Sequence, residues 1–159
     1  SPSWGTVEIS ANTTISTNKI IDFDYIADDG SKISLKDNAI AGFPDFMANV
    51  RLSYINGGFY ASLLTRSVGE SRTDNFGEMI TKTPSLISEL GYADNKLDAY
   101  TVCNLDLSYS MNDILSFQNI KVQAQVINLF NKLYAAGAEG KEFFVAAERS
   151  FYFGLQFGI

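Results

Sequence analysis

The final eleven residues, 149–159, constrain the fold of this chain more than any other stretch. Large apolar side chains alternate there with small or polar ones, which is the period of a β-strand with one apolar face. The apolar positions are Phe151, Phe153, Leu155, Phe157 and Ile159. The alternation continues to the last residue, whereas the end of a soluble domain usually frays. We therefore expect this strand to be paired and its apolar face to be covered.

Five further segments show the same alternation, and they are residues 7–17, 46–54, 59–66, 101–109 and 120–126. The connections between the six predicted strands run long, short, long, short, long. The first long connection is predicted to hold a hairpin in which Ile20–Ile26 and Ile33–Leu35 flank the turn signal Asp28-Asp29-Gly30. The other long connections, Gly69–Lys96 and Asn128–Ala147, are predicted to be loops, and a short turn is predicted around Met111–Phe117.

The first short connection carries a strong hairpin signal, the dipeptide Asn56-Gly57. A type I′ turn needs a positive φ at both central residues, which asparagine and glycine tolerate. If these two residues form the turn, Tyr54 pairs with Phe59 and Leu52 pairs with Ala61. This register brings the apolar face of one strand beside the apolar face of the next.

The pattern of short and long connections favours an antiparallel transmembrane β-barrel, because outer-membrane barrels have short periplasmic turns and long external loops. Aromatic side chains also gather at the end with the short turns, as an interfacial girdle requires. They are Trp4, Tyr54, Phe59, Tyr109, Phe117 and Phe157. Because about eight strands are the usual minimum for closure, we expect these six meandering strands to be the C-terminal part of a larger barrel.

The two side-chain parities of the strands differ in charge. The apolar parity holds no charged residue, as expected of a face in contact with lipid. The opposite parity holds the residues expected to line the lumen, which are Glu8, Arg51, Arg66, Asp106, Lys121 and Gln125. These charges either pair with one another or contact a ligand. The alternative is a soluble antiparallel β-barrel whose apolar parity faces inward around a small apolar ligand.

Composition removes several classes of function. The net charge of -6 argues against nucleic acid as a partner. The chain has no histidine, which excludes Ser-His and Cys-His nucleophile pairs and imidazole metal ligation. The single Cys103 is interpreted as a small buried hydrophobe. A carboxylate pair of Glu8 and Asp106 is the remaining hydrolytic option, and nothing in the sequence brings the two together. We therefore predict no enzyme activity, no cofactor and no metal site.

Two stretches near the carboxyl end resemble a known family. The segment Asn128-Leu129-Phe130-Asn131-Lys132-Leu133-Tyr134 resembles the Asn-Leu-Phe-Asp/Asn-x-x-Tyr motif of TonB-dependent outer-membrane receptors. The terminal strand is similar to the signal that the barrel-assembly machinery reads, with Ile159 in place of the usual phenylalanine. Gly42-Phe43-Pro44 and Ser67-Val68-Gly69 resemble further segments of the family, with Ser67 in place of the common tyrosine.

The resemblance implies that residues 1–159 are the C-terminal part of a barrel of about 22 strands, with the plug domain absent from this chain. It implies import of a scarce ligand such as a ferric siderophore, haem, cobalamin or an oligosaccharide across the outer membrane of a Gram-negative bacterium. The implied partners are outer-membrane lipid, the remaining barrel and its plug, the barrel-assembly machinery, and the TonB complex through the missing N-terminal part. Tyr92, Tyr100 and Tyr134 lie at loop ends, where they either stack on a ligand or anchor the barrel at the interface.

Overall fold

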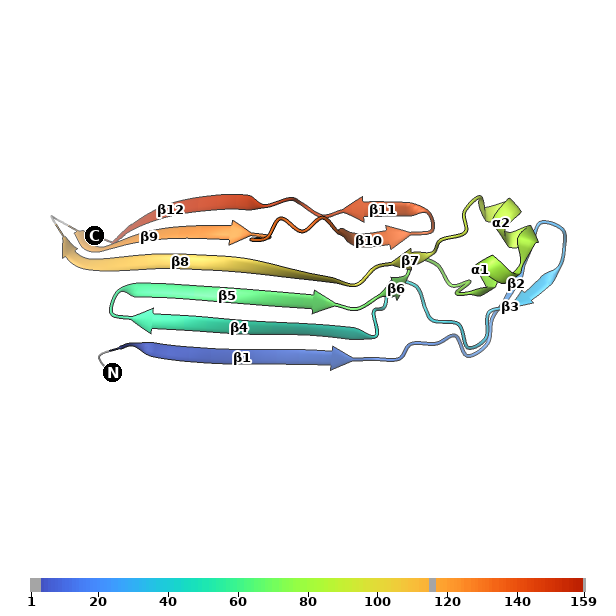
Figure 1. Ribbon diagram of the computed structural model, residues 1–159, viewed down its shortest axis with the longest axis horizontal. Coiled ribbons are helices and arrows are strands. Elements are labelled where there is room, and N and C mark those ends of the chain that lie inside the picture. Colours follow the sequence, from blue (N-terminus) through green and yellow to red (C-terminus); the bar gives the residue numbers. More distant parts are fainter. Residues whose placement is uncertain (1–3, 115–116, 159) are drawn as a thin grey trace.

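The chain forms one six-stranded antiparallel sheet that carries its long loops at one end (Figure 1). The structure is a computed structural model that describes residues 4–114 and 117–158. The sheet order is β1-β4-β5-β8-β9-β12, so every strand lies beside its neighbour in the meander. The strands are β1 (Thr6–Ile15), β4 (Phe46–Asn56), β5 (Phe59–Val68), β8 (Tyr100–Ile114), β9 (Phe117–Ile127) and β12 (Ser150–Gly158). The predicted fold class is therefore confirmed, and the sheet remains open at β1 and β12.

The long connections contain more regular structure than the sequence indicated. The first holds the predicted hairpin, formed by β2 (Asp24–Ile26) and β3 (Lys32–Ser34). The second was predicted to be a loop, but it contains β6 (Ser71–Arg72), α1 (Met79–Lys82), α2 (Pro84–Leu90) and β7 (Lys96–Leu97). The third was also predicted to be a loop, and it forms a hairpin of β10 (Ala135–Glu139) and β11 (Glu142–Val145). None of the helices among the described residues is long and apolar enough to span a membrane.

Two predictions about the short connections were wrong in detail. Asn56 pairs with Phe59 and Tyr54 pairs with Ala61, so the turn residues are Gly57 and Gly58 instead of Asn56 and Gly57. A Cβ atom at Gly58 would lie 2.1 Å from the carbonyl oxygen of Ser110, so the close approach of β8 requires glycine in the turn. The shift is two residues, which leaves both faces of the hairpin unchanged.

The second short connection is tighter than predicted, because Met111 and Phe117 lie within β8 and β9. The connecting residues 115–116 lie outside the described part of the chain. At this end of the sheet the predicted aromatic row is formed. The rings of Tyr54 and Phe59 lie 6.2 Å apart, and those of Phe117 and Phe157 lie 5.1 Å apart.

The main cluster of buried apolar side chains lies in the long loops and not on the sheet. Hairpin β2–β3 and its flanks supply Ala27, Ile33 and Leu35, and the second long loop supplies Phe76, Ile80 and Leu86. The rings of Tyr25 and Phe76 meet edge to face at 5.0 Å. The two short helices form because this packing buries their apolar side. We call this group the loop core.

The apolar face of the sheet is exposed. On β1 and β12, Ile9 is 74% and Phe153 is 83% accessible. The residues predicted as the assembly signal share this face, and they are Phe151, Phe153, Leu155 and Phe157, while Ile159 lies outside the described residues. On the polar face, by contrast, Ser62 is only 1% accessible because neighbouring side chains cover it. Among residues 4–114 and 117–158, the apolar parity is therefore not enclosed in the way that the soluble-barrel alternative requires.

Candidate functional site

The polar face of the sheet contains a hollow of about 440 Å³ lined by charged and aromatic side chains. The register brings them together, because Ser62, Asp106, Gln125 and Tyr152 lie in one row across four strands. Four of the six predicted lumen residues line this hollow, namely Arg51, Asp106, Lys121 and Gln125. Gln125 donates a 2.5 Å hydrogen bond from Nε2 to Oδ1 of Asp106, and the Arg51 guanidinium donates to Oγ of Ser62 at 3.3 Å. The hollow can therefore offer both charged and neutral hydrogen-bond donors.

The same register separates Glu8 from Asp106. Glu8 pairs with Ser53, Ser53 with Ser62, and Ser62 with Asp106, so two strands lie between the carboxylates. Three strand spacings place their backbones on the order of 14 Å apart, which is beyond the separation of about 5 to 10 Å that glycosidases use. The remaining hydrolytic option is therefore not supported by the geometry.

A further predicted lumen residue, Arg66, lies nearer the loops in a second hollow of about 250 Å³. Arg72 of β6 and Tyr100 of β8 also line it. Sequence reasoning missed Arg72, because the segment that carries it was predicted to be an unstructured loop. Arg72 lies opposite Lys96 in the short β6–β7 pairing. This pairing places Arg72 where the polar face adjoins the long loops.

The three tyrosines proposed from the sequence do not form one site. Tyr100 and Tyr134 stack with their ring centroids 4.3 Å apart, which joins the start of β8 to the third long loop. Tyr92 lies elsewhere, beside the loop core, where its hydroxyl donates a 2.8 Å hydrogen bond to Oδ2 of Asp74. Tyr92 therefore has a structural contact, whereas the Tyr100–Tyr134 pair lies close to the second hollow.

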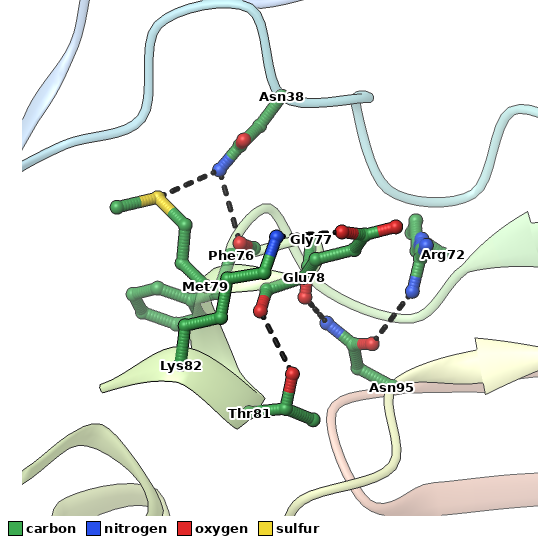
Figure 2. Close-up of polar contacts among 9 residues, drawn as sticks. All are labelled: Asn38, Arg72, Phe76, Gly77, Glu78, Met79, Thr81, Lys82 and Asn95. Carbon is green, nitrogen blue, oxygen red and sulfur yellow. Dashed lines mark hydrogen bonds and ion pairs between the residues drawn. The ribbon is translucent and has the colours of Figure 1, made fainter. Parts of the chain in front are cut away.

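Hydrogen bonds join the first long loop (residues 16–45) to the second (residues 69–99). Figure 2 shows the amide of Asn38 donating to the carbonyl oxygen of Phe76, at 3.0 Å. Asn95 is 2% accessible, accepts a bond from the Arg72 guanidinium at 3.0 Å, and donates to the Gly77 carbonyl at 2.9 Å. A buried amide with both of its ends paired specifies one arrangement of the surrounding chain. Asn95 therefore sets the geometry of the second loop and the direction of Arg72.

The third long loop (residues 128–149) is tied to the second by Thr73. The Thr73 hydroxyl donates to the carbonyl oxygen of Gly140 at 2.6 Å, and the Gly140 amide donates to the Thr73 carbonyl at 2.9 Å. All three long loops are thus connected through hydrogen bonds and the loop core. We refer to them together as the loop cluster.

The loop cluster contains a tyrosine, Tyr92, whose pKa is raised. Burial, followed by the hydrogen bond to Asp74, raises the pKa of Tyr92 to about 12 from an ordinary value of 10.0. A raised pKa means that the fold favours the neutral phenol, so this contribution to stability is complete below pH 10 and is lost as the pH rises towards 12. We expect amide protection in the loop cluster, measured relative to the intrinsic exchange rate at each pH, to fall over that interval in the wild type. The fall should be smaller in Tyr92→Phe, and an equal fall in the two proteins would contradict the assignment.

The segment that carries the family motif forms the junction between β9, the third loop and β12. Asn128 is 2% accessible and adopts a φ of 55°, in the left-handed region. Its side chain accepts from the Lys132 amide at 2.8 Å and donates to the Lys132 carbonyl at 2.9 Å. Asn131, with a φ of 53°, accepts from the Arg149 amide at 2.8 Å. Asparagine suits both positions, because it tolerates this backbone region and bonds locally.

The other motif residues have different environments. Leu129 donates its backbone amide to the Cys103 carbonyl at 2.7 Å, which anchors the junction on β8. Phe130 is 73% accessible, and Tyr134 stacks on Tyr100. The motif is therefore a structural connection in this chain, and its tyrosine is the member placed near a hollow.

Asn128→Ala is expected to lower the free energy of unfolding by about 1 to 3 kcal/mol, because the amide and carbonyl of Lys132 lose their hydrogen bonds to the buried Asn128 side chain. The alanine also keeps the left-handed φ, which costs about 1 to 2 kcal/mol more than in glycine. Asn128→Gly should therefore be the milder change. Thermal unfolding of the purified protein measures both, and equal effects would show that backbone strain plays no part.

Comparison with known proteins gives one family match and several structural matches. A family model described as TonB dependent receptor-like, beta-barrel matches residues 3–129. The ferric-catecholate import receptor Fiu from E. coli K12 is similar in structure, with a TM-score of 0.64 and 18% identity over 96% of this chain and 18% of that chain. The siderophore receptor PiuA from Acinetobacter baumannii is similar with a TM-score of 0.70 and 14% identity, over 95% of this chain and 19% of that chain. The chain thus spans less than a fifth of either protein. No curated protein sequence matches significantly.

Proposed function

Because this chain belongs to the family of TonB-dependent receptor β-barrels, we propose that it forms the C-terminal wall of an outer-membrane receptor that imports a scarce ligand. The observation that carries the proposal is the segregation of the two faces of the sheet. Apolar side chains such as Ile9 and Leu155 are exposed on one face, and charged side chains such as Arg51 and Lys121 line a hollow on the other. A sheet of this kind suits a barrel wall with lipid outside and a wet lumen inside.

Each part of the chain has a role in this proposal. The exposed face of β12 contacts lipid and is read by the barrel-assembly machinery, the polar face contacts the plug, and the loop cluster faces the outside of a Gram-negative cell. Energy reaches the receptor from the TonB complex through segments outside residues 1–159. The open edges of β1 and β12 pair with the remaining strands of the barrel, since an unpaired strand edge is not tolerated in lipid.

A ferric siderophore is the ligand class that we favour over haem, cobalamin or an oligosaccharide. The support is that two structural relatives are named as receptors for a ferric catecholate and for a siderophore. The lining of the hollows agrees with this class, because both contain arginine and tyrosine side chains that can donate hydrogen bonds to chelating oxygens.

Uptake of radiolabelled iron by iron-limited cells tests the proposal. Disruption of the gene that encodes this chain should abolish uptake from one or more ferric siderophores, and a plasmid copy should restore it. Unchanged uptake of every ferric siderophore offered would contradict the ligand class. Recovery of the protein as a monomer in buffer without detergent would contradict the barrel itself and favour the soluble alternative.

A further inference from the structure

The second hollow lies where the polar wall meets the loop cluster, and all three long loops contribute to it. Arg66 comes from β5 on the polar face, and Arg72 comes from β6 in the second loop. Gly42 of the first loop and Gly137 of the third complete the lining. Glycine at both of these places keeps side-chain bulk out of the hollow, which leaves the arginines accessible to a ligand.

The charge of this hollow is opposite to that of its surroundings. Residues 16–45 contain three basic and six acidic side chains, and residues 69–99 again contain three basic and six acidic ones. The six basic and six acidic side chains elsewhere cancel, so the whole net charge of -6 belongs to the first two long loops. The second hollow nevertheless has two arginines and no carboxylate in its lining.

Three acidic side chains of the second loop have polar partners within that loop. Asp74 accepts hydrogen bonds from the Tyr92 hydroxyl and the Asn95 amide, each at 2.8 Å. Glu70 pairs with Lys96 at 2.6 Å, and Glu78 pairs with Lys82 at 2.8 Å. Within the described ranges 4–114 and 117–158, every ion pair closer than 4.0 Å involves a lysine. Neither Arg66 nor Arg72 therefore forms an ion pair within 4.0 Å in this part of the structure, and Glu78, whose pKa Arg72 helps to lower, is paired with Lys82.

Arg72 is also held in place. Its guanidinium donates to Oδ1 of the buried Asn95 at 3.0 Å, as Figure 2 shows, and its backbone carbonyl accepts from the Gly42 amide at 2.9 Å. An arginine oriented by a neutral amide keeps its full charge and its remaining donors for another partner. Such an arrangement favours binding of an anionic oxygen group with little reorganisation.

We propose that Arg66 and Arg72 bind an anionic oxygen group of the imported ligand, such as a carboxylate or a catecholate. This inference rests on the proposed function and specifies the chemistry of its ligand. The planar fork of each guanidinium matches a pair of oxygens, and two arginines on different elements hold the group from two sides. Tyr100 lines the same hollow. In the proposed site, its ring lies beside the anionic group of the ligand.

Binding measurements on the complete receptor in detergent test the proposal, with an anionic ferric tris-catecholate complex and a neutral ferric trihydroxamate complex as probes. We expect the receptor to bind the anionic probe. Arg66→Gln and Arg72→Gln should each weaken that binding about tenfold or more, as loss of a charge-assisted hydrogen bond predicts. Arg72→Lys should restore part of the loss. Lys36→Gln removes the same charge from the exposed part of the first loop and should have little effect.

The other possible outcomes would overturn the proposal, and each of them would have a different cause. Binding of the neutral probe alone, or equal effects of Arg66→Gln and Lys36→Gln, would remove the anion site and leave the receptor function standing. A lower unfolding temperature with unchanged affinity would show that the arginines balance carboxylates of the plug domain instead. Binding of neither probe would remove ferric siderophores as the ligand class, and the anion site with them.

Discussion

Leu63→Arg is expected to lower the free energy of unfolding of the complete receptor in lipid by about 2 to 4 kcal/mol. Leu63 lies in the middle of β5 on the apolar face, opposite Leu52 of β4 and Leu105 of β8. An arginine at this position would place its charge in hydrocarbon near the centre of the bilayer. The measurement is equilibrium unfolding by urea in lipid vesicles.

The neighbouring residue provides a matched control. Leu64 has the same side chain, but it lies on the polar face, opposite Arg51 and Asn104. Leu64→Arg should cost clearly less than Leu63→Arg, because the lumen is wet and screens the repulsion from Arg51. If Leu64→Arg is the more damaging change, the two faces have been assigned the wrong way round.

Leu86→Ala is expected to destabilise the loop cluster by about 2 to 5 kcal/mol, the range for removal of a large side chain from a packed core. Leu86 lies on α2 and is 0% accessible, and the loop core is the main cluster of buried apolar side chains in the loops. The short helices α1 and α2 depend on this packing, because helices of four and seven residues are not stable alone.

Amide hydrogen exchange separates this effect from any change in the barrel. Protection should fall in the loop cluster, including hairpin β2–β3, and should stay unchanged in the six strands of the sheet. Leu133→Ala is the control, since Leu133 lies in the third loop and is 70% accessible. Loss of protection confined to α2 would contradict the view that the loops form one packed unit.

The strands were predictable from the sequence because membrane strands alternate at every second residue, and this period fixes the face of the sheet on which each side chain lies. Parity also placed Arg51, Asp106 and Lys121 on the polar face, where the strand register brings them to one hollow. It misplaced the turn after β4, because the reason for glycine at position 58 is the close approach of Ser110 from a strand distant in sequence.

The loops were less predictable for a physical reason. Their structure depends on contacts between segments distant in sequence, such as Asn38 with Phe76 and Thr73 with Gly140. Local signals did exist for α2, which begins at Pro84 and is capped by Gly91 with a φ of 72°. No local pattern indicated that Arg72 would line the same hollow as Arg66, since β6 is only two residues long.

Spin-label accessibility along β5 tests the central claim most directly. Single labels at positions 59 to 68, in the complete receptor in bilayers with Cys103 and other native cysteines replaced, report contact with dissolved oxygen or with a water-soluble nickel chelate. We predict a strict alternation in which odd positions, from Phe59 to Ser67, respond to oxygen and even positions respond to nickel. Uniform accessibility, or oxygen contact at the even positions, would contradict the assignment of this chain to a barrel wall.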